Sequence, residues 1–153
     1  MRGWLKALLI AAAVVVLLTV AIIAVLIGGS VIGFKAAQKA GNEAATLQDL
    51  KTIAAGEIQY FNTHKRAFGT FDQLIKDMNF DTRFSGNPPV ADGYTFTLKL
   101  KPKTPSGPAF YTLNADPQTD STGKNHFFID STSGTIHVNS TQPASATDPP
   151  LGG

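Results

Sequence analysis

Three aspartates are the residues of this sequence that come nearest to a chemical site. Asp116, Asp120 and Asp130 lie within 15 positions of one another, in a stretch that also holds Gly123 and several Ser and Thr residues. Carboxylate oxygens are the ligands that Ca²⁺ takes in proteins. Their spacing matches no calcium-binding loop, and Asp and Gly also favour turns for conformational reasons alone. The sequence therefore predicts no metal or cofactor beyond this weak calcium candidate.

The other groups that could act in catalysis are scattered along the chain. The histidines are His64, His126 and His137, and the sequence places no acid partner or third metal ligand beside the last two. No nucleophile elbow, phosphate-binding loop or acid and base pair occurs. The absence of Cys excludes thiolate metal sites, iron–sulfur clusters and Cys nucleophiles. We therefore expect no enzymatic activity, no catalytic residues and no small-molecule substrate.

The charge distribution argues against a nucleic-acid partner. The net charge of +2 comes from Arg2 and Lys6, because residues 35–153 hold 11 basic and 11 acidic residues. Nucleic-acid binding requires a basic patch on a folded surface. Here the basic surplus flanks an apolar segment, as the topology signal of a membrane protein does.

Residues 7–34 have the length and composition of a membrane-spanning helix. They contain no charged side chain, and 23 of the 28 are hydrophobic. A span needs roughly 20 apolar residues, and a cleaved signal peptide has a shorter apolar region. We predict a retained span, with residues 1–6 as its cytoplasmic flank. Gly29 and Gly33 are spaced for close helix packing, which predicts self-association or a protein partner, although glycines are also common in membrane helices.

Beyond residue 35 the apolar spacing becomes that of an amphipathic helix. Successive apolar residues are three or four positions apart and fall on one stripe: Ala44, Leu47, Leu50, Ala54, Ile58 and Phe61. No Pro occurs before residue 88, so this stripe and the apolar segment are predicted to form one helix of about 55 residues. Glu43, Asp49 and Glu57 are expected to be solvated or to face other subunits.

Alternating apolar and polar residues predict strands in the second half of the chain. The predicted strands cover residues 94–101, 109–115, 125–130 and 135–139, and the short loops between them favour antiparallel pairing. The predicted fold is α+β, with the long N-terminal helix, transmembrane and then amphipathic, packed on a four-stranded antiparallel sheet. Residues 35–139 form its head domain, and the Pro-rich residues 140–153 are expected to be a flexible tail.

Several short motifs, together with the helix and the sheet, resemble a known family. They are residues 42–45, 47–53 and 57–61 in the helix, 68–74 after it, 93–96, 127–130 and 134–136 in the strands, and 148–151 near the end. The chain resembles type IV pilins and the pseudopilins of type II secretion systems over about residues 33–151. This implies a pilin-like fold and a structural or assembly role in one of these machines. It also implies a single-pass protein of the bacterial inner membrane, with a cytoplasmic N-terminus and a periplasmic, extracytoplasmic head.

The N-terminus departs from the pattern of this family. Its members carry a Gly before a cleavage site and a Glu at the fifth mature position. Gly3 and Trp4 are the candidate leader junction here, but Leu8 then stands in place of the Glu, and aligning on Glu43 places Val15 there instead. Two functions stay open. One is a structural subunit, and the other is a stand-alone membrane-anchored extracytoplasmic binding domain that is neither processed nor polymerised.

Overall fold

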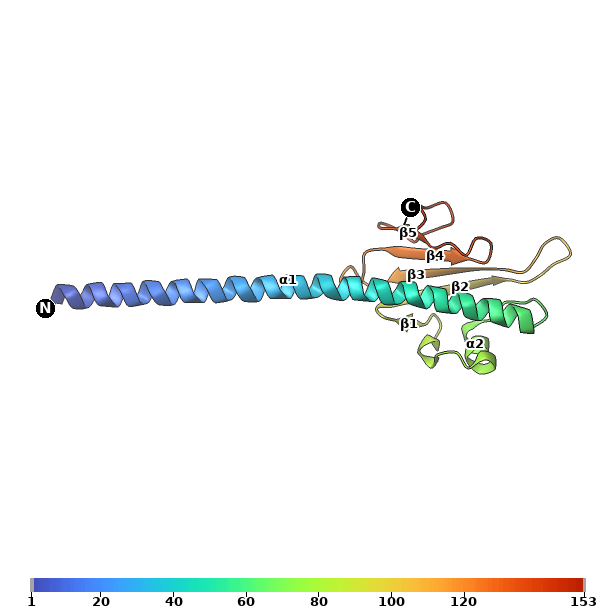
Figure 1. Cartoon of the computed structure of the whole chain (residues 1–153), viewed down its shortest axis with the longest axis horizontal. Coiled ribbons are helices and arrows are strands. Elements are labelled where there is room, and N and C mark those ends of the chain that lie inside the picture. The colour runs from blue at the N-terminus through green and yellow to red at the C-terminus, as the bar shows by residue number, and fades with distance from the viewer. Residues whose placement is uncertain (1, 153) are drawn as a thin grey trace. The chain divides into compact units, whose positions relative to one another are not determined.

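The computed structural model describes the backbone of residues 2–152 and the side chains of residues 17–20 and 33–152. The chain forms two compact units, Met1–Ala37 and Gln38–Gly153, and we call the second unit the head. Helix α1 (Arg2–Thr63) contributes its first part to the first unit and its remainder to the head (Figure 1). All other described helices and strands belong to the head.

The predicted membrane span over residues 7–34 is not supported. Among the described residues no helix is both long enough and apolar enough to cross a membrane. Three expectations depended on this span and are overturned together with it. They are the single-pass topology, the bacterial inner-membrane location, and the cytoplasmic and periplasmic placement of the two ends. A span needs roughly 20 apolar residues, whereas the described side chains of α1 comprise only positions 17–20 and a stretch that carries charges from Lys35 onward. Residues 7–16 and 21–32 lie outside the described side chains.

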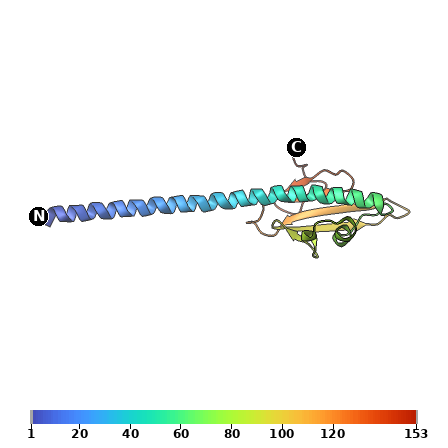
Figure 2. The same cartoon turned by 60° about the horizontal axis from the view of Figure 1, so that its bottom comes forward.

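Within the head, α1 buries one stripe of its surface, and Figure 2 shows this part of the helix lying along one face of the sheet. The buried residues recur every three or four positions: Thr46, Asp49, Leu50, Ile53, Ala54, Glu57 and Tyr60. Leu50 and Ala54 were correctly predicted on this stripe, but Ala44 and Ile58 are exposed. A prediction from apolar spacing alone misplaces the buried stripe, because several of the buried residues are polar.

The sheet is a five-stranded antiparallel meander. Its strands are β1 (Val90–Ala91), β2 (Tyr94–Lys101), β3 (Phe110–Pro117), β4 (His126–Asp130) and β5 (His137–Asn139), and each pairs with the next along the chain. The α+β class, the long helix and the antiparallel pairing are confirmed. The predicted count of four strands is wrong, because β1 was missed.

The missed strand belongs to a tight hairpin. Ala91 pairs with Tyr94 in register, which leaves Asp92 and Gly93 as the two turn residues. Both have positive φ, 51° and 74°, as a two-residue hairpin turn of type I′ requires. Asp-Gly between two apolar residues is itself a hairpin signal, but β1 is only two residues long and shows no alternation.

A short helix follows the loop after α1. α2 (Phe71–Met78) begins with a capping box, in which the Gln73 backbone N–H donates to Thr70 Oγ1 and the Thr70 N–H donates to Gln73 Oε1. The pair satisfies two backbone donors that a helix start otherwise leaves free. The 3₁₀ turn η1 (Thr82–Phe84) then leads toward β1, so α2 and η1 lie at the β1 end of the sheet (Figure 1).

The core of the head is rich in aromatic rings. Phe84 packs edge-on against Phe96, with 5.4 Å between ring centroids, and Tyr94 lies 5.9 Å from Phe127. The Tyr94 hydroxyl donates to the Asn125 carbonyl at 3.0 Å. Gly123 is required beside it, because a Cβ at that position would lie 2.0 Å from the Tyr94 oxygen.

The C-terminal segment is bound to the sheet, in contrast to the flexible tail that was expected for residues 140–153. The Val138 N–H donates to the Pro149 carbonyl at 3.0 Å, and the Leu151 N–H donates to the Ile136 carbonyl at 2.8 Å. Asn114 donates through Nδ2 to the carbonyl of Ala144, whose side chain is buried. The composition of residues 140–153 could not predict this ordered structure, because it depends on hydrogen bonds to distant residues. Those residues are Ile136 and Val138, at and beside β5, and Asn114 of β3.

Candidate functional site

The buried stripe of α1 contains a carboxyl group, that of Glu57, which forms no ion pair with the described residues. The side chain of Glu57 is fully buried, and its Oε2 accepts from the Gly69 N–H at 2.9 Å. Its other oxygen, Oε1, has no hydrogen-bond partner among the described residues. Burial raises the pKa of Glu57 to about 7, and the Gly69 N–H partly opposes this rise. Glu57 is therefore an internal group that ties α1 to the loop before α2, and its expected position in solvent or at a subunit interface is wrong.

Asp49 is the second buried acid of α1, and it pairs with Arg83. The Asp49 side chain is almost wholly buried, and its Oδ1 accepts from Arg83 Nη2. Burial raises the pKa of Asp49 to about 6, with the Arg83 charge acting in the opposite direction. Arg83 also contacts Asp92 at 3.0 Å and Asp81 at 3.2 Å. This cluster connects α1 to η1 and to the β1–β2 turn, so its role is to hold the head together.

Glu43 fixes the loop between β3 and β4. Its Oε1 accepts from the backbone N–H groups of Lys124 and Asn125 at 2.8 and 3.2 Å, and its Oε2 accepts from Asn125 Nδ2 at 2.9 Å. The neighbouring Asn42 donates through Nδ2 to the Thr122 carbonyl at 2.8 Å. The two residues position a loop, and Glu43 is not the freely solvated charge that was expected.

The three calcium candidates do not form one site. Asp130 pairs in register with Thr112 on β3, so Asp116 lies four residues further along that strand, a separation of roughly 13 Å at the usual rise. Asp130 is buried and accepts from the backbone N–H groups of Thr132 and Ser133. Asp120 is exposed. In the part of the chain that the structure describes, no three His, Cys, Asp or Glu residues are grouped to hold a metal ion.

His126 has an acid partner that sequence reasoning did not find. Its Nδ1 lies 2.6 Å from Asp116 Oδ1, a contact made possible by the pairing of Ala115 with Phe127 in the adjacent strands. Only the register of β3 and β4 could have revealed this pair. His137 Nδ1 lies 2.6 Å from the Asp148 carbonyl oxygen, and the imidazole of His64 stacks on a tyrosine ring. The described histidines thus act within the fold, each with a separate partner.

The residues predicted for helix packing and leader cleavage lie in the first unit. Gly3, Trp4 and Gly29 fall outside the residues whose side chains the structure describes. A Cβ placed on Gly33 would meet nothing within 4 Å, so this face of α1 is open. The described large apolar residues of the same unit are also exposed: Leu17 by 70%, Leu18 and Val20 by 59% each, and Phe34 by 70%.

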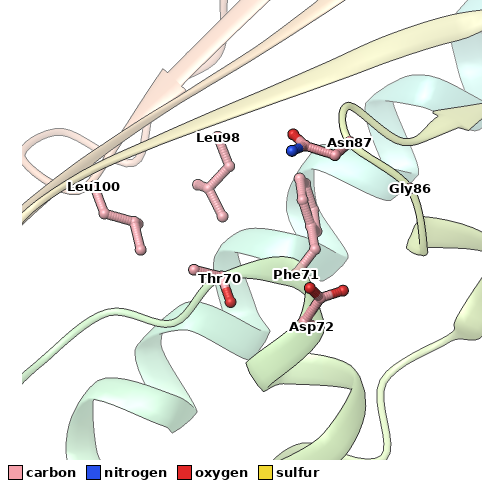
Figure 3. A pocket seen from close by; sticks show the side chains of 7 residues that line it. All are labelled: Thr70, Phe71, Asp72, Gly86, Asn87, Leu98 and Leu100. Atoms are coloured by element: carbon pink, nitrogen blue, oxygen red, sulfur yellow. The ribbon is translucent and has the colours of Figure 1, made fainter.

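A small pocket lies beside β2. It has a volume of about 240 Å³ and is formed by three separate segments of residues 70–100. Figure 3 shows Leu98 and Leu100 extending from β2 toward the start of α2, with Asn87 at one end. The lining residues are Thr70, Phe71, Asp72, Gly86, Asn87, Leu98 and Leu100. The pocket combines apolar walls with a polar rim, as sites for small ligands or for side chains of a partner do.

No protein-family model, curated protein or solved structure matches this chain. Two surfaces among the described residues are candidates for contact with other molecules. One is the exposed apolar side of α1 in the first unit, and the other is the pocket beside β2.

Proposed function

We propose that this chain is a non-catalytic structural subunit with a pilin-like architecture, which assembles with other subunits of a type IV pilus or a type II secretion system. The observation that carries the proposal is the exposure of Leu17, Leu18, Val20 and Phe34 on α1. Leu17, Leu18 and Val20 lie within one turn of the helix, and neighbouring exposed apolar side chains mark surfaces that bind other molecules. A helix from another subunit would remove these side chains from water, and the open face at Gly33 would allow a close approach.

The acidic residues of the head support a structural role. Glu43, Asp49 and Glu57 each bind another segment of the same head, through the β3–β4 loop, Arg83 and the loop before α2 respectively. A catalytic carboxyl must reach a substrate, whereas Asp49 and Glu57 are buried in the core. The acids of this helix are thus used to build the head, and α1 in the first unit is left for assembly.

Crosslinking through introduced thiols tests the assembly. The natural chain has no Cys, so Gly33→Cys places a single thiol on the open face of α1. The matched control is Gln59→Cys, at an exposed polar position of the same helix within the head. We expect a bismaleimide reagent to join the Gly33→Cys chain into covalent dimers far more efficiently than the control. Equal yields from the two variants, or monomer alone from both, would overturn the proposal.

The alternative is a stand-alone binding domain of pilin-like fold that is neither processed nor polymerised. The pocket beside β2 favours it, because a structural subunit has no evident need of such a site. The intact mass of the mature protein separates the two functions. A chain that begins at Trp4 with a methylated amine supports the assembling subunit, whereas one that retains Met1 or Arg2 supports the binding domain.

A further inference from the structure

Most of β2 has an open edge on the side of β1. β1 pairs only with Tyr94 and Thr95, and the next contact on this side is the Phe96 N–H, which donates to the Pro89 carbonyl at 2.9 Å. Backbone groups alternate between the two edges of a strand. Leu98 and Leu100 therefore present their N–H and C=O groups at the same edge as Phe96. No described strand pairs with them there.

The pocket lies directly beside this open edge. The side chains of Leu98 and Leu100 form one wall and Phe71 another, with Asp72 and Asn87 at the rim (Figure 3). An added strand would run beside β2, and every second side chain of that strand would point to the face of the sheet that carries the pocket. The pocket therefore favours apolar residues at alternate positions of such a strand.

The opposite face of the same strand is basic. Lys99 and Lys101 alternate with the two leucines, so they point away from the pocket, and both are exposed. Lys103 follows β2 and is also exposed. Within the described residues none of the three forms an ion pair. Pairing with the β2 edge of a second copy would bring like charges together, which is unfavourable, whereas acidic side chains would be attracted.

We propose that the open edge of β2 binds an extended segment of a partner protein by strand addition, and that apolar and acidic residues alternate in this segment. Backbone hydrogen bonds to Leu98 and Leu100 hold the segment. Its apolar side chains enter the pocket, and its carboxylates lie beside Lys99 and Lys101. This inference does not depend on the proposed assembly through α1, since it uses residues of the head alone.

Fluorescence anisotropy with a synthetic peptide tests the charge selection. The probe is a short fluorescein-labelled peptide in which glutamate and valine alternate, titrated with the full chain. We expect saturable binding that weakens about tenfold in Lys99→Glu/Lys101→Glu, and the reversed-charge variant should instead bind a lysine–valine peptide. The matched control, Lys51→Glu/Lys65→Glu, carries the same change in net charge at exposed positions away from the pocket and should bind like the natural chain.

A second peptide separates strand addition from simple charge attraction. Methylating alternate backbone nitrogens of the glutamate–valine peptide keeps its charges but removes the donors that pair with a strand edge. Loss of binding by this peptide supports strand addition. The proposal is overturned if the methylated peptide binds as tightly as the parent, if the natural chain shows no saturable binding, or if both charge variants weaken binding equally. Circular dichroism of each variant verifies that the head remains folded.

Discussion

The two parts of α1 differ in which kind of side chain they bury. In the first unit Phe34 is 70% exposed, whereas in the head Glu57 is 0% and Asp49 is 2% exposed. Polarity alone would assign the opposite burial to these residues. In the head, burial follows the angular position of a residue relative to the sheet, and an acidic residue on that stripe must be neutralised or paired. The described apolar residues of the first unit have no such cover, which is why we assign them to a partner.

The two buried acids of α1 show two ways of meeting the cost of desolvation. Asp49 has a cation, Arg83, on one of its oxygens, and burial still raises its pKa to about 6. Glu57 forms no ion pair with the described residues and accepts one backbone hydrogen bond, and burial raises its pKa to about 7. The difference predicts that Glu57 is the group whose charge most directly opposes folding at neutral and alkaline pH.

The largest expected effect tests the contrast between the two parts of the helix directly. Leu50→Ala should lower the free energy of unfolding by about 2–5 kcal/mol, because Leu50 is fully buried in the core. Phe34→Ala should change it by less than about 0.5 kcal/mol in dilute solution, because Phe34 is exposed. Urea denaturation followed by circular dichroism measures both. Similar losses in the two variants would show that the first unit has a core of its own.

A smaller effect is expected at Glu57, and it depends on pH. The folded pKa of about 7 lies above the ordinary value of 4.5, so the folded state retains a proton that the unfolded state releases between these values. Stability therefore falls as pH rises from 4.5 to 7 and is lowest above 7. Glu57→Gln removes the charge, so the variant should be more stable than the natural chain by roughly 3 kcal/mol at pH 8 and nearly equal at pH 4.

Thermal unfolding across this pH range measures the difference. Tyr60 and Tyr111 are affected by the Glu57 charge, but burial raises the pKa of both, that of Tyr111 to about 12, so they stay neutral throughout the experiment. Asp120→Asn is the matched control, because Asp120 is an exposed acid. If the stability of Glu57→Gln and of Asp120→Asn depends on pH in the same way, Glu57 carries its charge in the folded state without an energetic penalty. Burial would then impose no electrostatic cost on the part of α1 that lies in the head.

The elements of the head could be predicted where local periodicity determines them. The alternation in residues 94–101 gave β2 with its observed bounds, and the spacing after residue 35 gave the helix. β1 was missed because a strand of two residues is too short to show alternating apolar and polar residues. The turn residues Asp92 and Gly93 could have indicated the hairpin. Local patterns describe single elements, so they were most reliable for long ones.

The contacts between elements could not be predicted in the same way. Asp116 meets His126 because of the β3–β4 register, and the pocket beside β2 requires three separate segments. The burial of Asp49 and Glu57 depends on which stripe of α1 faces the sheet, and apolar spacing placed that stripe about one residue away from its true position. A shift of one residue rotates a helix face by about 100°, which is enough to exchange buried and exposed side chains.

Among the substitutions in the head, the smallest expected loss of stability is at Ile58, and its comparison with a buried isoleucine tests that shift of the stripe. Ile53 is fully buried, whereas Ile58 is 59% exposed although its spacing places it on the predicted apolar stripe. Ile58→Ala should cost less than about 1 kcal/mol, partly because Ala favours a helix more than Ile does, whereas Ile53→Ala should cost about 2–5 kcal/mol. Urea denaturation of both variants decides between the two stripes. Equal costs would mean that Ile58 is also buried in solution, and burial in the head would then follow hydropathy after all. If Ile58→Ala costs little and Ile53→Ala costs much, burial in the head is determined by the angular position of a residue relative to the sheet. The described large apolar residues of the first unit are exposed instead, and this is what separates the two parts of α1.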